Sequence, residues 1–355
     1  MRYFNNYDDL KFFVDPKPFN KYTYKDVLKY AIGANMYMPA TKEDIFDKLI
    51  NNKFREIGAI TLCCEDAIPE DKVEDAEINI LDVLNRLYEK SLKEENLLDR
   101  LPLIFIRVRN VDQFKALSKK LTKNHVKNLA GFNFPKFNSI NGREYFKTLD
   151  ELATKHNETL YGMPILEDKR VIYQETRINE LVEIKNILKD YAKYVLNIRV
   201  GGTDFSSIYG LRRSVNNTIW DIRAISNCLI DILNIFLRED ENFVVSGPVW
   251  EYFSWDENSP ELKGLKKELD LDIQNGFQGK TIIHPSQIDT VNESYIVNYY
   301  EYIDAKNILE ASGGVFKSEE GNRMNEVNPH RNWAYKILAK ANIFGVADKE
   351  AKCKK

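Results

Sequence analysis

Short apolar runs and helix-like segments alternate along most of this chain, and their number and spacing predict a (β/α)₈ barrel, the TIM barrel. Eight runs rich in β-branched and aromatic residues have the length of buried strands. The segments between them repeat apolar residues three and four positions apart, so a helix is expected after each strand and the sheet is expected to be parallel. Eight such units within about 250 residues fit a barrel. A doubly wound sheet is the alternative, but the segment after the first run, YMPATKED, lacks the glycine-rich turn of that fold.

The predicted strands follow one another at fairly even spacing. They are residues 34–39, 58–66, 103–108, 129–136, 160–167, 195–202, 243–248 and 280–285. Among the segments between and around them, the clearest helical periodicity is found over residues 42–54, 111–125, 178–194 and 218–239. Thr41, with Asp44 three residues later, resembles a capping box that would start the first of these helices.

Three parts are expected along the chain. Residues 1–30 would form an N-terminal extension, and residues 31–298 the catalytic barrel. Residues 299–355 would form a helical segment that covers a barrel mouth and joins subunits. A Gly-Gly pair at 313–314 divides this last part into two helical stretches, YYEYIDAKNILEA and PHRNWAYKILAKA.

Composition excludes several classes of protein. The 51 basic and 54 acidic residues give a net charge of −3, so no surface for nucleic acid is indicated. No apolar run approaches the ~18 residues of a membrane helix, and the N-terminus, MRYFNNYDDLKFFV, lacks a signal-peptide pattern. The four cysteines, including the adjacent Cys63 and Cys64, show neither zinc-site nor disulfide spacing. We therefore expect a protein of the reducing cytoplasm.

The stretch NGFQGKTIIHPSQ contains a Gly-Lys-Thr triplet at 279–281 that invites comparison with a phosphate-binding loop. Such a loop has four residues between its first glycine and its Gly-Lys pair, and it opens a helix. Here Gly276 stands only three positions before the second glycine, and a strand-like run follows. We therefore expect structural roles: the glycines shape a turn, Lys280 enters the eighth strand, and His284 and Gln287 fasten the next loop.

Charged residues stand where the predicted strands end. In a parallel barrel these ends meet at one mouth, which is where active sites lie. The strand-end candidates are Glu65, Asp66, Arg107, Arg109, Lys136, Glu167, Asp168, Asp204 and His284. A simpler interpretation applies to Glu65, Asp66 and Asp168, because a carboxylate after a strand often caps the next helix.

Glu167 and Asp204 are candidate metal ligands. They follow adjacent predicted strands, and Gly201 and Gly202 before Asp204 allow a ligand to approach the backbone closely. Two carboxylates without a cluster of His or Cys suit a hard cation that keeps several waters, which is Mg²⁺ (or Mn²⁺) rather than zinc. The alternative is that these acids pair with nearby arginines.

Two cationic residues are candidates for holding a substrate. The planar guanidinium of Arg107 suits a carboxylate, although it could instead form a salt bridge inside the mouth. Lys136 could act electrostatically or form a Schiff base. A metal site and an arginine beside it favour the electrostatic role.

Together these motifs resemble the citrate lyase β-subunit-like family, within the HpcH/HpaI aldolase and citrate lyase superfamily of Mg²⁺-dependent barrel enzymes. Residues 276–287 resemble the family signature GF-GK-IHP-Q. CCEDAIPEDK resembles DLEDAVP–K, IRVRNVD resembles VRVNPLD, and FPKFNS resembles LPKVES. MPILED and VGGTDFSSIYGLRR resemble the segments that carry the family's two metal-binding acids. The matches run in order from about residue 33 to 340.

The resemblance implies a lyase or aldolase that cleaves or forms a carbon–carbon bond beside a carbonyl, through an enolate. It implies that Mg²⁺ binds to Glu167 and Asp204 and that Arg107 binds the substrate carboxylate. The other substrate-binding residues it implies are Arg109, Lys136, Gly202 and Pro248.

The resemblance also implies supporting residues and an assembly. Glu65 and Asp66 would orient water molecules around the metal. Glu326, reaching over from a neighbouring subunit, or a water molecule would be the base. The chain would form a homo-oligomer, a trimer or a multiple of it, acting on a small carboxylate or acyl-thioester.

This sequence departs from the family pattern at three places. Cys63 replaces an aspartate, Arg109 replaces an asparagine, and KRVIYQETRINEL does not contain the family's TPRG. These departures count against acyl-thioester substrates in particular. Two other functions nevertheless stay open. One is a hydrolase or synthase for a malyl-type thioester, for which Arg212 and Arg213 are candidate diphosphate-binding residues. The other is a non-catalytic barrel, which loss of Glu167 or Asp204 would have supported.

Overall fold

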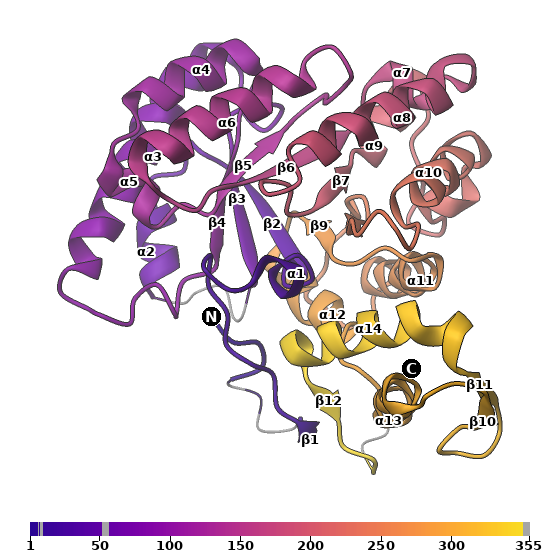
Figure 1. Ribbon diagram of the computed structural model, residues 1–355. Coiled ribbons are helices and arrows are strands. Elements are labelled where there is room, and N and C mark those ends of the chain that lie inside the picture. The colour runs from indigo at the N-terminus through magenta and orange to yellow at the C-terminus, as the bar shows by residue number, and fades with distance from the viewer. Residues whose placement is uncertain (6, 8–9, 52–56, 351–355) are drawn as a thin grey trace.

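A parallel sheet of eight strands forms the centre of the computed structural model, which describes residues 1–5, 7, 10–51 and 57–350. Figure 1 shows the sheet with helices arranged around it. Every predicted barrel strand is present, at or within the predicted limits. The strands are β2 (Ala34–Pro39), β3 (Ala59–Cys63), β4 (Leu103–Arg107), β5 (Gly131–Phe134), β6 (Tyr161–Leu166), β7 (Ile198–Val200), β8 (Val245–Ser246) and β9 (Lys280–Ile282).

The sheet closes into a barrel. Its strand order is β8-β7-β6-β5-β4-β3-β2-β9, and β9 pairs in parallel with β2. The remaining seam lies between β8 and β9. There the Gln278 N–H donates to the Val245 carbonyl oxygen at 2.8 Å, and the Gly247 N–H donates to the Gly279 carbonyl oxygen at 2.9 Å. The chain therefore has the predicted TIM-barrel architecture.

Helices follow the strands as the βα pattern predicts. They are α1 (Lys25–Leu28), α2 (Ile45–Ile50), α3 (Val73–Ser91), α4 (Val111–Lys120), α5 (Lys123–Lys127), α6 (Gly142–His156), α7 (Lys169–Ile172), α8 (Gln174–Asp190), α9 (Gly202–Ile208), α10 (Arg223–Phe236), α11 (Pro260–Asn275), α12 (Ile288–Glu293), α13 (Tyr299–Glu310) and α14 (Val327–Phe344). Short 3₁₀ turns, η1 (Glu70–Lys72), η2 (Ile219–Asp221) and η3 (Pro285–Gln287), precede three of them. No helix in the described part of the chain is both long and apolar enough to cross a membrane.

Several helix limits differ from the prediction. The helix predicted over 111–125 is two helices, because Leu121 adopts an extended conformation with ψ 128° and Thr122 caps α5. The capping box at Thr41 is wrong, since α2 begins at Ile45 and Asp44 is its N-cap without a side-chain hydrogen bond. The last part of that predicted helix lies outside the described residues.

The two ends of the chain meet. Strand β1 (Phe12–Val14) pairs antiparallel with β12 (Val346–Ala347), and Figure 1 shows both away from the barrel sheet. Tyr3 is fully buried and stacks on Phe344 with ring centroids 4.6 Å apart. The N-terminal segment is thus packed into the main hydrophobic core. The limits 1–30, 31–298 and 299–355 stay a prediction.

The C-terminal helices form a second, smaller hydrophobic cluster, in which Ala305 and Ile308 of α13 and Ala334, Ile337 and Ala341 of α14 are buried. A hairpin of β10 (Val315–Lys317) and β11 (Met324–Glu326) connects the two helices, and the sequence analysis missed it. Helix α14 also packs on α1. Because α1 directly precedes β2, this contact lies at the amino end of the strands, away from the mouth.

A buried ion network fixes β9 against α11. Lys280 is fully buried, and its Nζ lies 2.9 Å from Glu268 and 2.6 Å from Asp272. Arg213 also contacts Glu268, at 2.9 Å, and the Trp220 indole N–H donates to Asp272 at 2.9 Å. Two acids and two cations are therefore paired in this buried network. The lysine of the Gly-Lys-Thr triplet thus has a structural role, as predicted.

The turn before β9 and the loop after it also have the structural roles predicted for residues 276–287. Gly276 and Gly279 have φ of +104° and +87°, a region that other residues rarely adopt. The Gln287 side-chain oxygen accepts hydrogen bonds from the Ile283 and His284 N–H groups, and its amide donates to the carbonyls of Trp250 and Tyr252. Gln287 thus ties the loops after β8 and β9 together.

Candidate active site

Six charged residues from the predicted strand ends lie together at the mouth; we call them the charged cluster. They are Glu65, Asp66, Arg107, Lys136, Glu167 and Asp204. Arg107 is at the end of β4 and is 7% exposed. Its Nη2 lies 2.6 Å from Glu65, 3.0 Å from Glu167 and 3.3 Å from Asp66. One guanidinium nitrogen therefore joins acids that follow two different strands.

Lys136 is the second cation of the cluster. Its Nζ lies 2.6 Å from Glu65, 3.4 Å from Asp204 and 3.6 Å from Asp66. Its backbone has φ +48°, a left-handed conformation that costs a non-glycine residue on the order of 1–3 kcal/mol. In this conformation its N–H donates to Glu167 at 3.0 Å. Backbone and side chain of one residue thus contact both candidate metal ligands.

The glycine pair before Asp204 gives the acids their room. A Cβ at Gly201 would lie 2.3 Å from Oε2 of Glu167, closer than atoms can pack. A Cβ at Gly202 would lie 2.8 Å from Pro248. Helix α9 begins at Gly202, so Asp204 sits in its first turn. Glu167 therefore leaves room only for glycine at 201, and Pro248 restricts position 202.

Burial and charge act against each other on the acids. Burial raises the pKa of Glu167 to about 7, although Arg107 and Lys136 oppose the shift. Burial also raises the pKa of Glu65. For Asp66 burial acts in the same direction, but the hydrogen bond with Glu65 and the two cations outweigh it and lower the pKa.

The cations behave in the opposite way. Burial alone would lower the pKa of Arg107 and of Lys136, but the surrounding carboxylates outweigh it and raise both pKa values. Both side chains therefore stay protonated at neutral pH.

The cluster suits a divalent cation. Four carboxylates and two protonated bases sum to −4 + 2 = −2 when every group is ionised. Glu167 and Asp204 offer hard oxygen donors, and glycine at 201 leaves space beside Glu167. Among the described residues, no group of three or more His, Cys, Asp or Glu is arranged to hold a metal. A cation here would therefore be held by two side chains and by water, as Mg²⁺ commonly is.

A family model for carbon–carbon bond lyases of the TIM-barrel fold matches residues 26–346. The chain belongs to this family. No curated protein matches the sequence closely enough to count as a relative.

The lyase shares its fold with two solved structures. One is CitE from Mycobacterium tuberculosis, solved with magnesium, acetoacetate and coenzyme A; it is 18% identical with a TM-score of 0.56, over 88% of this chain and 99% of that chain. The other is Haloferax volcanii malate synthase in a lead(II) complex; it is 11% identical with a TM-score of 0.55, over 88% of each chain. At these identities the likeness shows the fold alone.

Four residues named from the sequence lie outside the charged cluster of the lyase. His284 forms a hydrogen bond with Ser286 in the loop after β9. Arg109 is half-buried; the titratable group on which its charge acts is Cys64, and no contact links it to the cluster among the described residues. Asp168 accepts a hydrogen bond from the Arg170 N–H at 2.8 Å, so it caps α7. Glu326 ends β11, on the hairpin next to α14.

The sequence analysis missed Tyr37 of β2. Its ring centroid lies 5.9 Å from the Arg107 guanidinium, and its hydroxyl accepts a hydrogen bond from Asn133 at 2.7 Å. The alternation of side chains along β2 was the available signal, because Tyr37 pairs in register with Thr61 and both point into the barrel.

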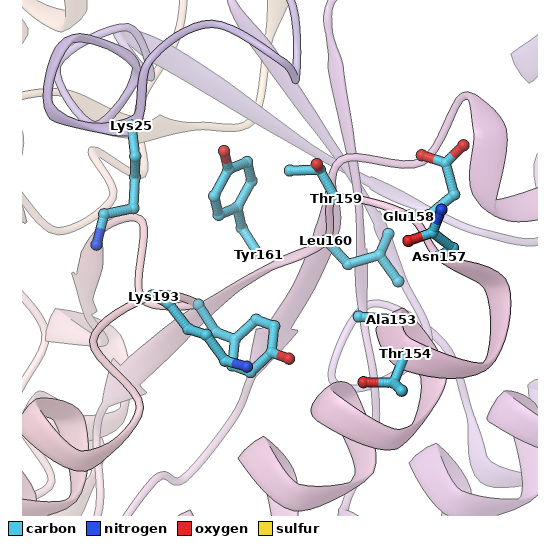
Figure 2. Close-up of a pocket in the computed structure, with 10 residues that line it drawn as sticks. Lys25, Ala153, Thr154, Asn157, Glu158, Thr159, Leu160, Tyr161 and Lys193 are labelled. Atoms are coloured by element: carbon cyan, nitrogen blue, oxygen red, sulfur yellow. The ribbon is translucent and has the colours of Figure 1, made fainter.

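A separate cavity of about 380 Å³ lies at the start of β6, the amino end of the strand. Figure 2 shows Lys25, Lys193 and Tyr161 on its walls. None of its lining residues belongs to the charged cluster. Because active sites of TIM barrels lie at the other end of the strands, this cavity is not the candidate active site.

Proposed function

We propose that this lyase uses Mg²⁺ (or Mn²⁺) to break a carbon–carbon bond next to the carbonyl of a small carboxylated substrate. The observation that carries the proposal is the charged cluster, which has a net charge of −2 at the mouth of the barrel when all six side chains are ionised. The magnesium and acetoacetate in the M. tuberculosis CitE structure support the same choice of metal and substrate class. A divalent cation here would stabilise the negative charge that develops as the bond breaks.

Glu167 and Asp204 would hold the cation, and Arg107 would hold the substrate carboxylate. The Nε atom of Arg107 is buried and makes no hydrogen bond to any described residue. The guanidinium thus keeps donor capacity after its Nη2 has paired with the acids, and a carboxylate suits that remaining edge. Gly202 and Pro248, which pack together beside Asp204, would form a wall of the substrate site.

Lys136 would act through its charge. A Schiff base requires a neutral amine, whereas the carboxylates around Lys136 raise its pKa and keep it protonated. Glu65 bridges the two cations, at 2.6 Å from each. Glu65 and Asp66 would therefore fix Arg107 and Lys136 in place and orient water near the candidate ligands.

In the cleavage direction, a base removes the proton from the β-hydroxyl of the substrate. The electrons of that O–H bond form a new carbonyl, and the electron pair of the broken carbon–carbon bond moves onto the neighbouring carbonyl as an enolate. Protonation of the enolate carbon completes the reaction. We assign the base to Glu326 of another copy of the chain, because the hairpin that carries Glu326 adjoins α14, and α14 packs at the far end of its own barrel.

A thioester substrate has less support. Its diphosphate would need basic side chains at the mouth, and Arg213 was one candidate. However, Arg213 is buried, pairs with Glu268 and lies over the Trp250 ring at 5.0 Å. Arg213 is therefore committed to the structure, and of the two candidates only Arg212, which is exposed, could contact a diphosphate. A free keto acid or hydroxy acid is the substrate class that we propose.

Calorimetric titration of Mg²⁺ into metal-free protein tests the proposal. We expect saturable binding that pyruvate or oxaloacetate strengthens and that Asp204→Asn abolishes. Asp270→Asn is the matched control, because Asp270 is exposed on α11 and should bind Mg²⁺ as the wild type does. An absence of Mg²⁺ binding in the wild type, with and without keto acid, would contradict the metal-dependent mechanism.

A further inference from the structure

Polar side chains occupy much of the barrel interior, where branched aliphatic residues usually pack. They are Asn35, Tyr37, Thr61, Asn133, Asn197, Arg199, Ser246 and Thr281. Asn133 of β5 donates to Thr61 of β3 at 3.1 Å, and β4 lies between these strands. Arg199 of β7 likewise reaches Thr281 of β9 at 2.5 Å, past β8. Contacts that skip a strand must cross the inside of the barrel.

Arg199 is a buried cation without an acidic partner. Arg199 is 1% exposed; its Nη2 donates a hydrogen bond to Thr281, and its guanidinium also forms a hydrogen bond with the Tyr37 hydroxyl. Its Nε and Nη1 atoms are buried and unpartnered among the described residues. The titratable groups that act on it are the phenols of Tyr37 and Tyr295, and no salt bridge to it occurs in the described chain.

Tyr37 does not supply the missing negative charge. Burial raises the pKa of its hydroxyl, and the nearby Arg199 and Arg107 do not reverse the shift. The phenol is therefore neutral at physiological pH, while a guanidinium stays protonated in proteins. Burial of an unpaired ion costs several kcal/mol. A negative charge from outside the chain is needed near Arg199.

A further donor points to the same place. The side-chain oxygen of Asn35 accepts a hydrogen bond from the Thr61 hydroxyl at 3.0 Å. The NH₂ group of Asn35 is buried and has no hydrogen-bond partner among the described residues. Asn35 pairs in register with Thr281, the residue that Arg199 contacts. Asn35 and Arg199 are thus both neighbours of Thr281, and the NH groups of both have donor capacity that one ligand could use.

We infer that the barrel interior binds a small monovalent anion at Arg199, below the charged cluster. The ligand has the size of a halide ion or of one carboxylate group, and the donors of Arg199 and Asn35 bind it. Two sources have this chemistry: a free inorganic anion, and the second carboxylate of a dicarboxylic substrate. The second source rests on the proposed function, whereas anion binding itself does not.

Crystals of the wild-type protein grown in sodium bromide, measured at the bromine absorption edge, test this inference directly. We expect an anomalous peak within hydrogen-bond distance of Nε or Nη1 of Arg199. In solution, chloride and bromide should raise the melting temperature saturably, and gluconate, an anion too large for the site, should not at equal ionic strength. Water density at Arg199 without an anomalous peak would overturn the inference, whatever the variants do.

Variants and competitors separate the two sources. Arg199→Met should lose the halide-specific stabilisation, and Arg143→Met, at an exposed arginine on α6, should keep it. If malonate removes the bromide peak and acetate does not, the natural anion is the second carboxylate of the substrate. If the peak persists with both, the natural anion is free in solution. Because these measurements need no turnover, their failure is distinguishable from failure of the proposed lyase activity.

Discussion

Arg107 and Glu167 illustrate how closely the candidate site depends on single side chains. Arg107 contacts three acids through one nitrogen, and Glu167 accepts from both Arg107 and the Lys136 N–H. Each acid remains ionised only to the extent that these partners offset its burial. Substitutions at this scale should therefore change metal binding and pH dependence before they change the fold.

The raised pKa of Glu167 predicts a pH-dependent metal affinity. A proton competes with the cation for this carboxylate, and the metal-free carboxylate titrates at about 7. As the pH falls below 7, Glu167 gains its proton, so the apparent affinity for Mg²⁺ should fall by about tenfold per pH unit. Above pH 8 it should level off. Calorimetric titrations from pH 5.5 to 8.5 measure this, and an affinity that stays constant between pH 6 and 7.5 would contradict it.

Gly201→Ala should disturb Glu167 without a change elsewhere. The new methyl group would overlap the carboxylate, so we expect Mg²⁺ affinity to fall on the order of 10- to 100-fold. Gly210→Ala is the control, because no atom lies within 4 Å of a Cβ there; its positive φ of +63° should cost some stability and leave binding intact. Equal Mg²⁺ affinities for the two variants would show that the space beside Glu167 is not used.

At the scale of elements, the strands were the most predictable part of the fold. Buried parallel strands appear in the sequence as short runs rich in β-branched and aromatic residues, so β2 to β9 were found at or within their predicted limits. The break between α4 and α5 was missed because Leu121 continues the apolar periodicity while its backbone is extended. The β10–β11 hairpin was missed because its residues are mostly exposed and carry little pattern.

In the candidate site, too, some features could be predicted from the sequence and others could not. Charged residues after strands could be placed at one mouth, because the barrel brings the strand ends together. Their contacts could not be predicted, since Arg109 follows the same strand as Arg107 and yet lies apart from the cluster. The polar interior and Arg199 were not predicted, because the run NIRVGG indicates that 195–202 is a buried strand but not which of its side chains point into the barrel.

Lys280 should contribute several kcal/mol to the free energy of unfolding through its contacts between β9 and α11. Lys280→Met would leave Glu268 and Asp272 buried with fewer cations, which typically costs about 3–5 kcal/mol. Lys263→Met, at an exposed position of α11, should be nearly neutral. Urea unfolding of both variants measures the difference; a loss below about 1 kcal/mol for Lys280→Met would mean that the network is readily replaced by packing.

At the scale of the whole molecule, the C-terminal helices do not bring Glu326 to the mouth of their own barrel. Helix α14 packs on α1 at the amino end of the strands. If Glu326 acts in catalysis, it must act on a neighbouring copy. A complete site then needs two chains, and a homo-oligomer, a trimer or a multiple of it, becomes a requirement of the chemistry.

Mixing two inactive variants tests this arrangement. Arg107→Met and Glu326→Gln should each lose most activity, and subunit exchange between them should restore about one quarter of the wild-type level, since each partner of a site is intact half of the time. A mixture of wild type with Arg107→Met should keep half of the wild-type level with or without exchange, and native mass spectrometry of the mixtures verifies that subunits exchange. No recovery despite exchange, or a monomer by light scattering, would mean that Glu326 does not act across subunits, and a Glu326→Gln variant that keeps its activity would place Glu326 outside the reaction.

The pairing of β1 with β12 has a consequence for synthesis in the cell. Phe12 pairs with Ala347, so the partner of the first strand is made 335 residues after it. At roughly 5–20 residues per second, the ribosome needs on the order of 20 to 70 s to supply it. Strand β2 likewise waits for β9. The nascent chain therefore exposes the unpaired edge of β2 and the aromatic rings near its N-terminus until translation is nearly complete. Chaperones should stay bound to it until α14 and β12 leave the exit tunnel.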